Sequence, residues 1–378
     1  MIDIIVVPYR DESFLTKYGP IVRDWHIILG LAEQACIDKI TIVNRPTPPF
    51  LDLIRKKNGK TILKSILGDK AAKISFVSSL SFDFSWVYKK RLWTADCYKK
   101  TVEDVINDIL KNNNKKVILL DFTPMSKMPY ELINSKCDLY WYDMIDNFSK
   151  HNRFTARERI AVKDKYVTLA NELSNYKTYI TCVALGCQRE INSANILPNG
   201  LVDYCIEETP ISHPEYDFGF CGFVTNKFDV EFVKYLCDLG YSVVVWGDIY
   251  STETKKYLMN AGAILKGRFT YKDFNIVFSS FKVGLVPYIK ELSHDESPLK
   301  IYEYLRHGAA VLSLIEYEVI NKHIYYFESG YPTKYEIKKI IENSSGEIYG
   351  DVASIIHDAS WAFKVTKLID RFMLDGVV

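Results

Sequence analysis

Short runs of β-branched and aromatic residues alternate with longer amphipathic stretches along almost the whole chain, and few architectures accommodate that order. Strand, helix and strand in repetition are typical of a mostly parallel sheet covered by helices. The strands expected in the first half are 2–8, 39–44, 73–79, 116–122, 139–144 and 178–184. Those expected in the second half are 218–223, 241–247, 262–266, 282–287 and 309–315. The sequence therefore predicts an α/β protein.

Amphipathic stretches fill the intervals between these runs. The expected helices are 22–36, 96–112 and 156–174, followed by 228–239, 251–261, 270–280 and 298–307. A chain of 378 residues is long enough for two domains of ordinary size. The turn-rich segment Leu197-Pro198-Asn199-Gly200 is where we expect the boundary. The two halves are predicted to be Rossmann-like domains of comparable size, with parallel sheets that face each other across a cleft.

Composition argues against several other classes of protein. The eight cysteines include no C-x-x-C pair, and the seven histidines include no H-x-x-x-H spacing. We therefore expect reduced thiols and no bound metal ion. The sequence has no basic-then-apolar leader, and its apolar runs stay shorter than the roughly 18 residues that span a bilayer. We expect a cytoplasmic protein, held at most at the inner face of a membrane.

The net charge of +1 conceals an asymmetry between the halves. Residues 1–200 contain 30 Lys and Arg and 22 Asp and Glu, so their balance of +8 leaves −7 for residues 201–378. Within the basic half, Lys89-Lys90-Arg91 lies beside Trp86 and Tyr88. Basic and aromatic residues together suit an anionic bilayer or a lipid pyrophosphate. They also suit nucleic acid, the less favoured alternative, and a plain solvated face is a third interpretation.

The segment from Ser297 to Leu305 has the features of a helix start that holds an anion. Ser297 is a good N-cap and Pro298 suits the first helical position. The first-turn amides and the positive end of the helix dipole would then face the ligand. Lys300 and Glu303, three residues apart, can share one face of the helix. A cation and a carboxylate so placed can serve the phosphate and hydroxyl groups of a sugar nucleotide.

In four segments the chain resembles the GT-B fold glycosyltransferases, and within them the bacterial enzymes of polysaccharide and lipid-linked glycan synthesis. Residues 140–148 (YWYDMIDNF) resemble the Y-D-x-x-D-D-F segment of the acceptor domain, and 195–203 (NILPNGLVD) the interdomain turn. Residues 218–224 (FGFCGFV) resemble the first strand and loop of the donor domain. The most specific match is 281–313, which is similar to the nucleotide-sugar loop and helix with its SPLKxYEYL sequence.

The resemblance implies a hexosyl- or glycosyltransferase that uses a UDP- or GDP-sugar as donor substrate and needs no cofactor. Residues 1–200 would bind the acceptor, a hydroxyl of a glycan or of a lipid-linked glycan. Residues 201–354 would bind the nucleotide sugar, and a helix within 355–378 would cross back to the N-terminal domain. In this family positive protein charge, in place of a metal ion, stabilises the leaving group.

The family's E-x7-E pair brackets the donor, and here Asp295 and Glu303 have that spacing. Asp295, or the adjacent Glu296, would contact the transferred sugar, and Glu303 would accept hydrogen bonds from the ribose hydroxyls. The alternative for Glu303 is an ordinary surface pair with Lys300.

The diphosphate needs hydrogen-bond donors and positive charge. The amides of Ser297, Leu299 and Lys300, the Lys300 ammonium and the backbone near Gly222 are the candidates, with Lys227 in the following loop.

Arg268 is a further candidate cation for the diphosphate. The loop that contains Arg268 and Tyr271 resembles the one that frames the nucleobase. Each of these two side chains has a structural alternative, as a surface charge or a core residue.

On the acceptor side an inverting transfer needs a general base. Asp143 and Asp146 lie at or just past the end of a predicted strand, and Asp146 matches the family's D-D-F position better. The E-x7-E pattern usually accompanies retention, so both stereochemical outcomes stay open. Three other functions remain: glycosylation of modified bases in DNA, nucleotide-sugar epimerisation, and ligand binding without catalysis.

Overall fold

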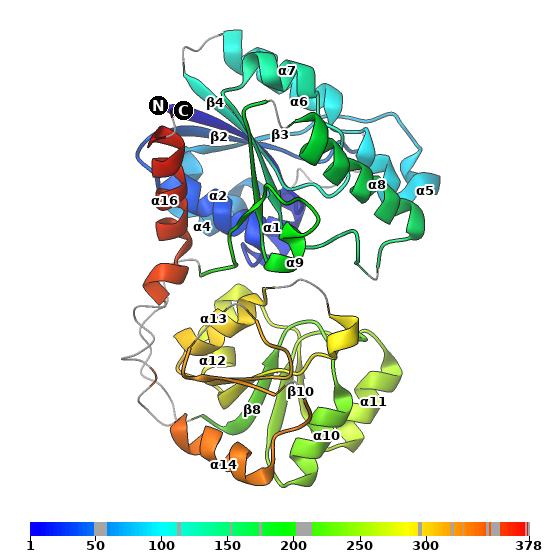
Figure 1. The fold of residues 1–378 in the computed structure, drawn as a ribbon, viewed down its shortest axis with the longest axis vertical. Coiled ribbons are helices and arrows are strands. Elements are labelled where there is room, and N and C mark those ends of the chain that lie inside the picture. The colour runs from blue at the N-terminus through cyan, green and yellow to red at the C-terminus, as the bar shows by residue number, and fades with distance from the viewer. Residues whose placement is uncertain are drawn as a thin grey trace. The chain divides into compact units, whose positions relative to one another are not determined.

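A computed structural model describes residues 1–48, 59–111, 115–151, 153–173, 176–201, 214–293, 297–317, 319, 321–327, 329–344, 348, 356–374 and 376. The chain forms two compact units (Figure 1). Unit 1 comprises Met1–Pro198 and Trp361–Val378, and unit 2 comprises Asn199–Ser360. Each unit contains one parallel sheet, so the predicted α/β class with two parallel sheets is confirmed.

The sheet of unit 1 has the strand order β3-β2-β1-β4-β5-β6-β7, and all its pairs are parallel. Its strands are β1 (Ile2–Val7), β2 (Ile37–Val43), β3 (Ile74–Val77), β4 (Lys116–Asp121), β5 (Leu139–Met144), β6 (Thr178–Cys182) and β7 (Asn195–Ile196). The strand order reverses next to β1, between β1 and β4. In sheets of this kind, ligands bind beyond the carboxyl ends of the strands at such a point.

The helices of unit 1 cover both faces of this sheet (Figure 1). The first part of the chain forms α1 (Glu12–Tyr18), α2 (Arg23–Glu33), α4 (Gly59–Leu67), η1 (Gly68–Ala72), α5 (Trp86–Lys89), η2 (Lys90–Ala95) and α6 (Lys99–Lys111). Further on are α7 (Tyr130–Lys136), α8 (Ala156–Val167) with the π-helical turn η3 (Thr168–Glu172), α9 (Leu185–Gln188) and the last helix, α16 (Trp361–Leu374). Trp141 of β5 packs edge-on against Phe372 of α16, which joins the end of the chain to this unit.

The sheet of unit 2 is also parallel, in the order β10-β9-β8-β11-β12-β13. Its strands are β8 (Tyr216–Cys221), β9 (Val243–Trp246), β10 (Ile264–Gly267), β11 (Phe281–Val286), β12 (Ala310–Ser313) and β13 (Ile324–Tyr326). The order reverses between β8 and β11. The carboxyl ends of these two strands therefore mark the place where this unit is expected to bind a ligand.

The helices of unit 2 follow its strands in turn. They are α10 (Val230–Asp238), α11 (Thr252–Asn260), η4 (Tyr271–Asp273), α12 (Phe274–Phe278), η5 (Lys290–Leu292), α13 (Leu299–Arg306) and α14 (Lys334–Asn343). Among the described residues of both units, no helix is long and apolar enough to cross a membrane.

Helix α13 lies close to β11 because of one glycine. A Cβ placed on Gly284 would be 2.2 Å from ring atoms of Tyr304, so only a residue without a side chain leaves room for that ring. The Tyr304 hydroxyl accepts a hydrogen bond from the Cys221 amide at 3.0 Å and lies 3.2 Å from the Leu285 carbonyl, to which it donates. Tyr304 thus ties α13 to the ends of β8 and β11.

Replacement of Gly284 by alanine is expected to destabilise unit 2 by about 2–3 kcal/mol, because overpacking forces the Tyr304 ring and α13 away from the sheet. The half-buried Lys282 lies on the same strand and pairs with Asp217 at 2.9 Å, so Lys282→Ala is the matched control, with an expected cost of about 1 kcal/mol or less. Denaturant unfolding measures both changes. Equal stability of Gly284→Ala and the wild type would contradict the packing described for Tyr304.

Candidate functional site

The carboxyl ends of β8 and β9 are brought together by two glycines. Gly222 follows β8 with φ +140°, and Gly247 follows β9 with φ +129°. A Cβ on Gly247 would lie 1.9 Å from the Gly222 carbonyl oxygen. The Gly222 amide donates to the Trp246 carbonyl and the Val224 amide to the Asp248 carbonyl, both at 2.9 Å. These two amides are therefore occupied, and what Gly222 contributes is a close approach of the backbone that a side chain would prevent.

Lys300 of α13 makes this close approach. A Cβ on Gly222 would be 3.0 Å from Lys300 Nζ, so the ammonium lies directly beside the glycine backbone. The same Nζ is 3.9 Å from the ring centroid of Phe220 and donates to the Tyr288 hydroxyl at 2.5 Å. The structure thus places Lys300 and Gly222 together at the switch point of unit 2.

Lys227 approaches the same tyrosine. Its Nζ lies 4.4 Å from the centroid of the Tyr288 ring, while Lys300 Nζ lies 4.9 Å from it. Cations are attracted to the face of an aromatic ring, and an anion between them would be attracted to both. Two of the predicted cations therefore share one aromatic neighbour. Tyr288 itself was not predicted from the sequence, although its place two residues after β11 was a signal for it.

The predicted helix start differs from the observed one in a single residue. Helix α13 begins at Leu299, and its N-cap is Pro298, which has extended backbone (ψ 116°). The prediction of Ser297 as the N-cap was wrong, because its hydroxyl accepts from the Asn199 amide at 3.2 Å instead. The Ser297 carbonyl also accepts from the Asn199 side chain, at 2.5 Å. Ser297 therefore holds the loop in front of α13 and does not cap the helix.

Glu303 is the most unusual side chain at this site. It is 7% exposed, and within the described structure its Oε2 atom has no hydrogen-bond partner. It pairs with Arg306, whose Nη1 lies 4.0 Å from Oε1. Burial raises the pKa of Glu303 to about 7, and the Arg306 charge offsets only part of that rise. A buried carboxylate with an unused oxygen is suited to accept hydrogen bonds from a ligand.

His307 does not supply the missing partner. Its Nδ1 is 2.8 Å from the Glu303 carbonyl and 3.7 Å from Oε2 of the same residue. Burial lowers the pKa of His307 to about 4, so this imidazole is neutral near pH 7. The ion pairs of Glu303 do not include Lys300, whose ammonium bonds to Tyr288. The simple surface pair considered for Lys300 and Glu303 is therefore absent from the described structure.

The other predicted donor-site residues lie in different surroundings. Arg268, at the end of β10, is exposed and pairs with Asp248 through Nε at 2.9 Å and Nη2 at 2.5 Å. Tyr271 is half-buried in η4. Asp295 and Glu296 lie outside the described residues.

The two predicted bases of unit 1 differ sharply in accessibility. Asp143, at the end of β5, is fully buried and accepts from Arg23 Nε at 2.7 Å and Nη2 at 2.8 Å. Thr181 also donates to it, at 2.5 Å. Asp146 lies in the turn that follows and is half-buried, with Oδ2 4.0 Å from His151 Nε2. Of the two carboxylates, Asp146 is the one that solvent reaches.

A second buried ion pair lies at the carboxyl end of β4. Lys165 of α8 donates to Asp121 Oδ2 at 2.6 Å, and the Tyr140 hydroxyl donates to the same oxygen at 2.8 Å. Sequence reasoning did not select this pair, because its members are 44 residues apart and only the fold brings them together. Each partner is satisfied, which favours a structural role.

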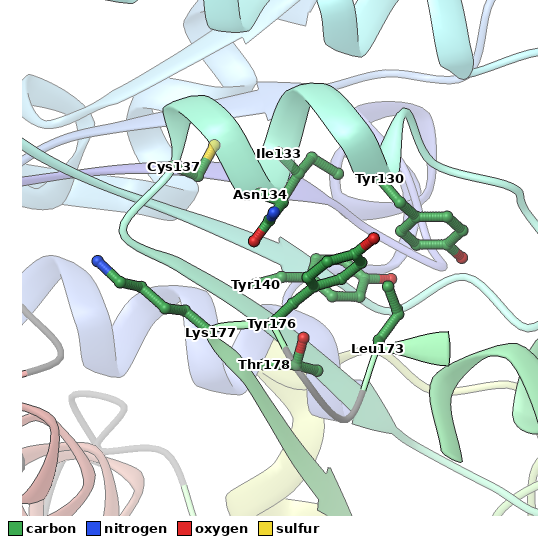
Figure 2. Close-up of a pocket in the computed structure, with 9 residues that line it drawn as sticks. All are labelled: Tyr130, Ile133, Asn134, Cys137, Tyr140, Leu173, Tyr176, Lys177 and Thr178. Atoms are coloured by element: carbon green, nitrogen blue, oxygen red, sulfur yellow. The ribbon is translucent and has the colours of Figure 1, made fainter. Parts of the chain in front are cut away.

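A small cavity in unit 1 is a poor candidate for a substrate site. It lies near the amino ends of β5 and β6, where Cys137 and Lys177 precede the strands and Tyr140 lines the wall (Figure 2). Its volume of about 10 Å³ is that of about one water molecule. Among the residues that the structure describes, no three His, Cys, Asp or Glu side chains lie close enough to hold a metal ion.

The chain matches no protein-family model and no curated protein. Solved structures do resemble it. AviGT4, a glycosyltransferase involved in avilamycin A biosynthesis, aligns over 99% of this chain and 98% of its own, with 11% identity and a TM-score of 0.53. The N-terminal domain of trehalose-6-phosphate phosphatase from Candida albicans aligns over 98% and 96%, with 10% identity and a TM-score of 0.60. At these identities the likeness shows the fold alone, which is GT-B.

Glu303→Gln is expected to stabilise the protein at pH 8 more than at pH 5. The pKa of Glu303 is raised from 4.5 to about 7 by folding. Between these values the unfolded state is ionised while the folded state stays neutral, so stability falls as the pH rises and the loss is complete above about pH 7. Glutamine cannot ionise and escapes this loss, which is on the order of 2 kcal/mol.

Thermal unfolding of the wild type and of Glu303→Gln across this pH range measures the difference. Glu336→Gln is the control, because Glu336 caps α14 at the surface and the pKa of its carboxyl is lowered by hydrogen bonds to Thr333. A stability difference between wild type and Glu303→Gln that stays constant from pH 5 to pH 8 would refute the burial of an unpartnered carboxylate.

Proposed function

We propose that this protein is a glycosyltransferase that transfers a sugar from a nucleotide sugar to a hydroxyl acceptor. The observation that carries the proposal is the pairing, on one helix, of the Lys300 ammonium and the unused buried oxygen of Glu303. Lys300 lies beside Gly222 at the switch point of unit 2, and Glu303 follows three residues later on the same helix. A diphosphate needs a cation such as the Lys300 ammonium, and ribose hydroxyls need an acceptor such as the Glu303 oxygen. The fold shared with AviGT4, itself a glycosyltransferase, supports the same conclusion.

Each part of the donor is assigned to a group of residues. Lys300 and Lys227 bind the diphosphate, with the amides of Ser297 and Leu299 as further donors. Glu303, as a carboxylate, accepts hydrogen bonds from the ribose hydroxyls. We assign contact with the transferred sugar to Asp295 or Glu296, and the nucleobase to the loop with Arg268 and Tyr271. The donor is a UDP- or GDP-sugar.

The reaction breaks the bond between the anomeric carbon and the diphosphate oxygen, which leaves with the electron pair. The acceptor oxygen forms the new bond to that carbon, and its proton goes to a base. For an inverting transfer we assign the base to Asp146, because the partners of Asp143 occupy it. Positive charge from Lys300 and Lys227 stabilises the leaving diphosphate. The acceptor is a hydroxyl of a glycan or of a lipid-linked glycan.

Titration of the full chain with UDP-glucose and with GDP-mannose tests the donor site. We expect one of these donors to bind, and Lys300→Gln to weaken its binding by roughly tenfold to a hundredfold, the value of a charge-assisted hydrogen bond. Lys338→Gln is the control, since Lys338 is an exposed lysine of α14 whose ion-pair partner, Glu342, is exposed as well. The proposal would be refuted if the wild type bound no nucleotide sugar, or if Lys300→Gln bound the donor as tightly as the wild type does.

Affinity for the donor is expected to depend on pH through Glu303. Because the carboxylate is the form that accepts hydrogen bonds from both ribose hydroxyls, binding weakens about tenfold for each pH unit below about 7. Glu303→Gln loses affinity and also loses this dependence. A wild-type affinity that stays flat between pH 5 and pH 8 would contradict the role assigned to Glu303.

The two candidate bases are distinguished by a pair of substitutions. Asp146→Asn should abolish transfer while the donor still binds, because only the proton acceptor is removed. Asp143→Asn should instead destabilise the fold by about 3 kcal/mol, since it removes the carboxylate charge that accepts two hydrogen bonds from the buried Arg23. Sugar transfer and thermal unfolding are measured on both variants. Full activity of Asp146→Asn would exclude it as the base, and product formed without any acceptor would indicate an epimerase.

A further inference from the structure

A segment of unit 1 directs large apolar side chains into solvent. Between Leu80 and Arg91, five such side chains are each between 52% and 75% exposed. They are Leu80, Phe82, Phe84, Val87 and Tyr88. Single exposed apolar residues are common at protein surfaces, but a cluster of this density usually marks a contact with a partner. We refer to residues 80–91 as the apolar segment.

Hydrogen bonds hold the start of the apolar segment in shape. The Ser81 amide donates to the Thr47 carbonyl at 2.9 Å, which joins the segment to the loop after β2. Asp83 then accepts from both the amide and the hydroxyl of Ser85, at 2.7 and 2.8 Å, and closes a turn around Phe84. The apolar side chains are therefore carried by a backbone that is hydrogen-bonded to the rest of unit 1.

The end of the segment is held in a similar way. Arg91 donates to the Arg153 carbonyl at 2.6 Å and lies 3.2 Å from a carboxylate oxygen of Glu158 on α8. Lys90 has a φ of +50°, in the left-handed region that a non-glycine residue adopts at a cost in energy. Such a conformation persists only where the surrounding structure fixes it. The chain turns sharply at this point, directly after the exposed apolar side chains.

Positive charge borders the apolar side chains. Lys89, Lys90 and Arg91 follow them directly, and all three are exposed. Exposed Arg153 precedes α8, and exposed Arg157 lies in its first turn. Helix α8 packs against η2, and Figure 1 shows α5 and α8 at the same edge of unit 1. The segment also contains the exposed carboxylate of Asp83, whose pKa is lowered by hydrogen bonds from Ser85, so the balance of residues 80–91 is three positive charges against one negative. The Glu158 carboxylate near Arg91 is buried. The border is therefore basic.

We propose that residues 80–91 insert into the surface of an anionic lipid bilayer. The aliphatic and phenyl groups would enter the boundary between headgroups and acyl chains, while the basic border meets lipid phosphates. Nucleic acid fits less well, because Leu80 and Val87 have neither the flat ring that stacks on a base nor a group that binds a phosphate. This proposal goes beyond the proposed function and does not depend on it, since membrane binding can be measured without any nucleotide sugar.

Sedimentation of the full chain with vesicles tests the proposal. Vesicles of phosphatidylcholine mixed with phosphatidylglycerol are compared with vesicles of phosphatidylcholine alone. We expect binding to the mixed vesicles, weakened by salt as surface electrostatics require. The double variant Phe82→Ser with Phe84→Ser should bind at least tenfold more weakly. Lys89→Gln with Lys90→Gln should bind roughly thirtyfold more weakly.

Matched controls come from unit 2. Ile276→Ser with Tyr335→Ser removes two side chains of similar exposure, 72% and 66%, and Lys334→Gln with Lys338→Gln removes two exposed charges. Both controls should bind vesicles as the wild type does. Thermal unfolding checks that every variant is folded.

Three outcomes would overturn the proposal. The first is that the wild type does not sediment with the mixed vesicles. The second is that the Phe82 and Phe84 variant binds the vesicles as well as the wild type does. The third is that the wild type associates with itself in the absence of lipid and that this variant does not. The last result would assign the segment to a contact between copies of the chain. Tight binding of duplex DNA that competes with the vesicles would also count against a lipid partner.

Discussion

The proposed donor site depends on the contact between Tyr304 and Gly284. The Tyr304 ring fills the space where a side chain on β11 would lie, and its hydroxyl bridges the Cys221 amide and the Leu285 carbonyl. Because α13 is fixed at this point, its neighbouring residue Glu303 is buried, and Lys300, one turn earlier, reaches the loop after β8. A helix held less closely would leave both charged groups in water, where they would interact only weakly with each other and with a ligand.

This arrangement is unfavourable for stability, which is itself an argument for function. A carboxylate with an unused buried oxygen costs free energy that a neutral side chain would not. The backbone at Gly222 and Gly247 would likewise be strained if either position carried a larger residue. The Lys300 ammonium is compensated by Phe220 and Tyr288. Glu303 has no equivalent compensation among the described residues. Buried ionisable groups of this kind are often found in binding sites, where the ligand supplies the missing hydrogen bonds.

Sequence patterns predicted the strands and the main helices because runs of β-branched residues and amphipathic periods are local signals. The short strand Ile324–Tyr326 was missed because three residues do not form a pattern, whereas α14 could have been found from its Thr333–Glu336 capping box. Lys300 and Glu303 could be selected from spacing. Their surroundings could not, because Tyr288 and the unused Glu303 oxygen depend on tertiary packing. The prediction of Ser297 as the N-cap was wrong for the same reason, because its hydroxyl accepts a hydrogen bond from Asn199, which is distant in sequence.

Proton exchange on ligand binding tests the central claim, that Glu303 receives the ribose as a carboxylate. Calorimetry with UDP-glucose and GDP-mannose at pH 6, in two buffers of different ionisation enthalpy, counts the protons released. Because the free carboxyl has a pKa of about 7 and is mostly protonated at pH 6, its ionisation on binding releases close to one proton per bound ligand. We expect this release for the wild type and none for Glu303→Gln. Binding without proton release, or equal release by both proteins, would contradict it.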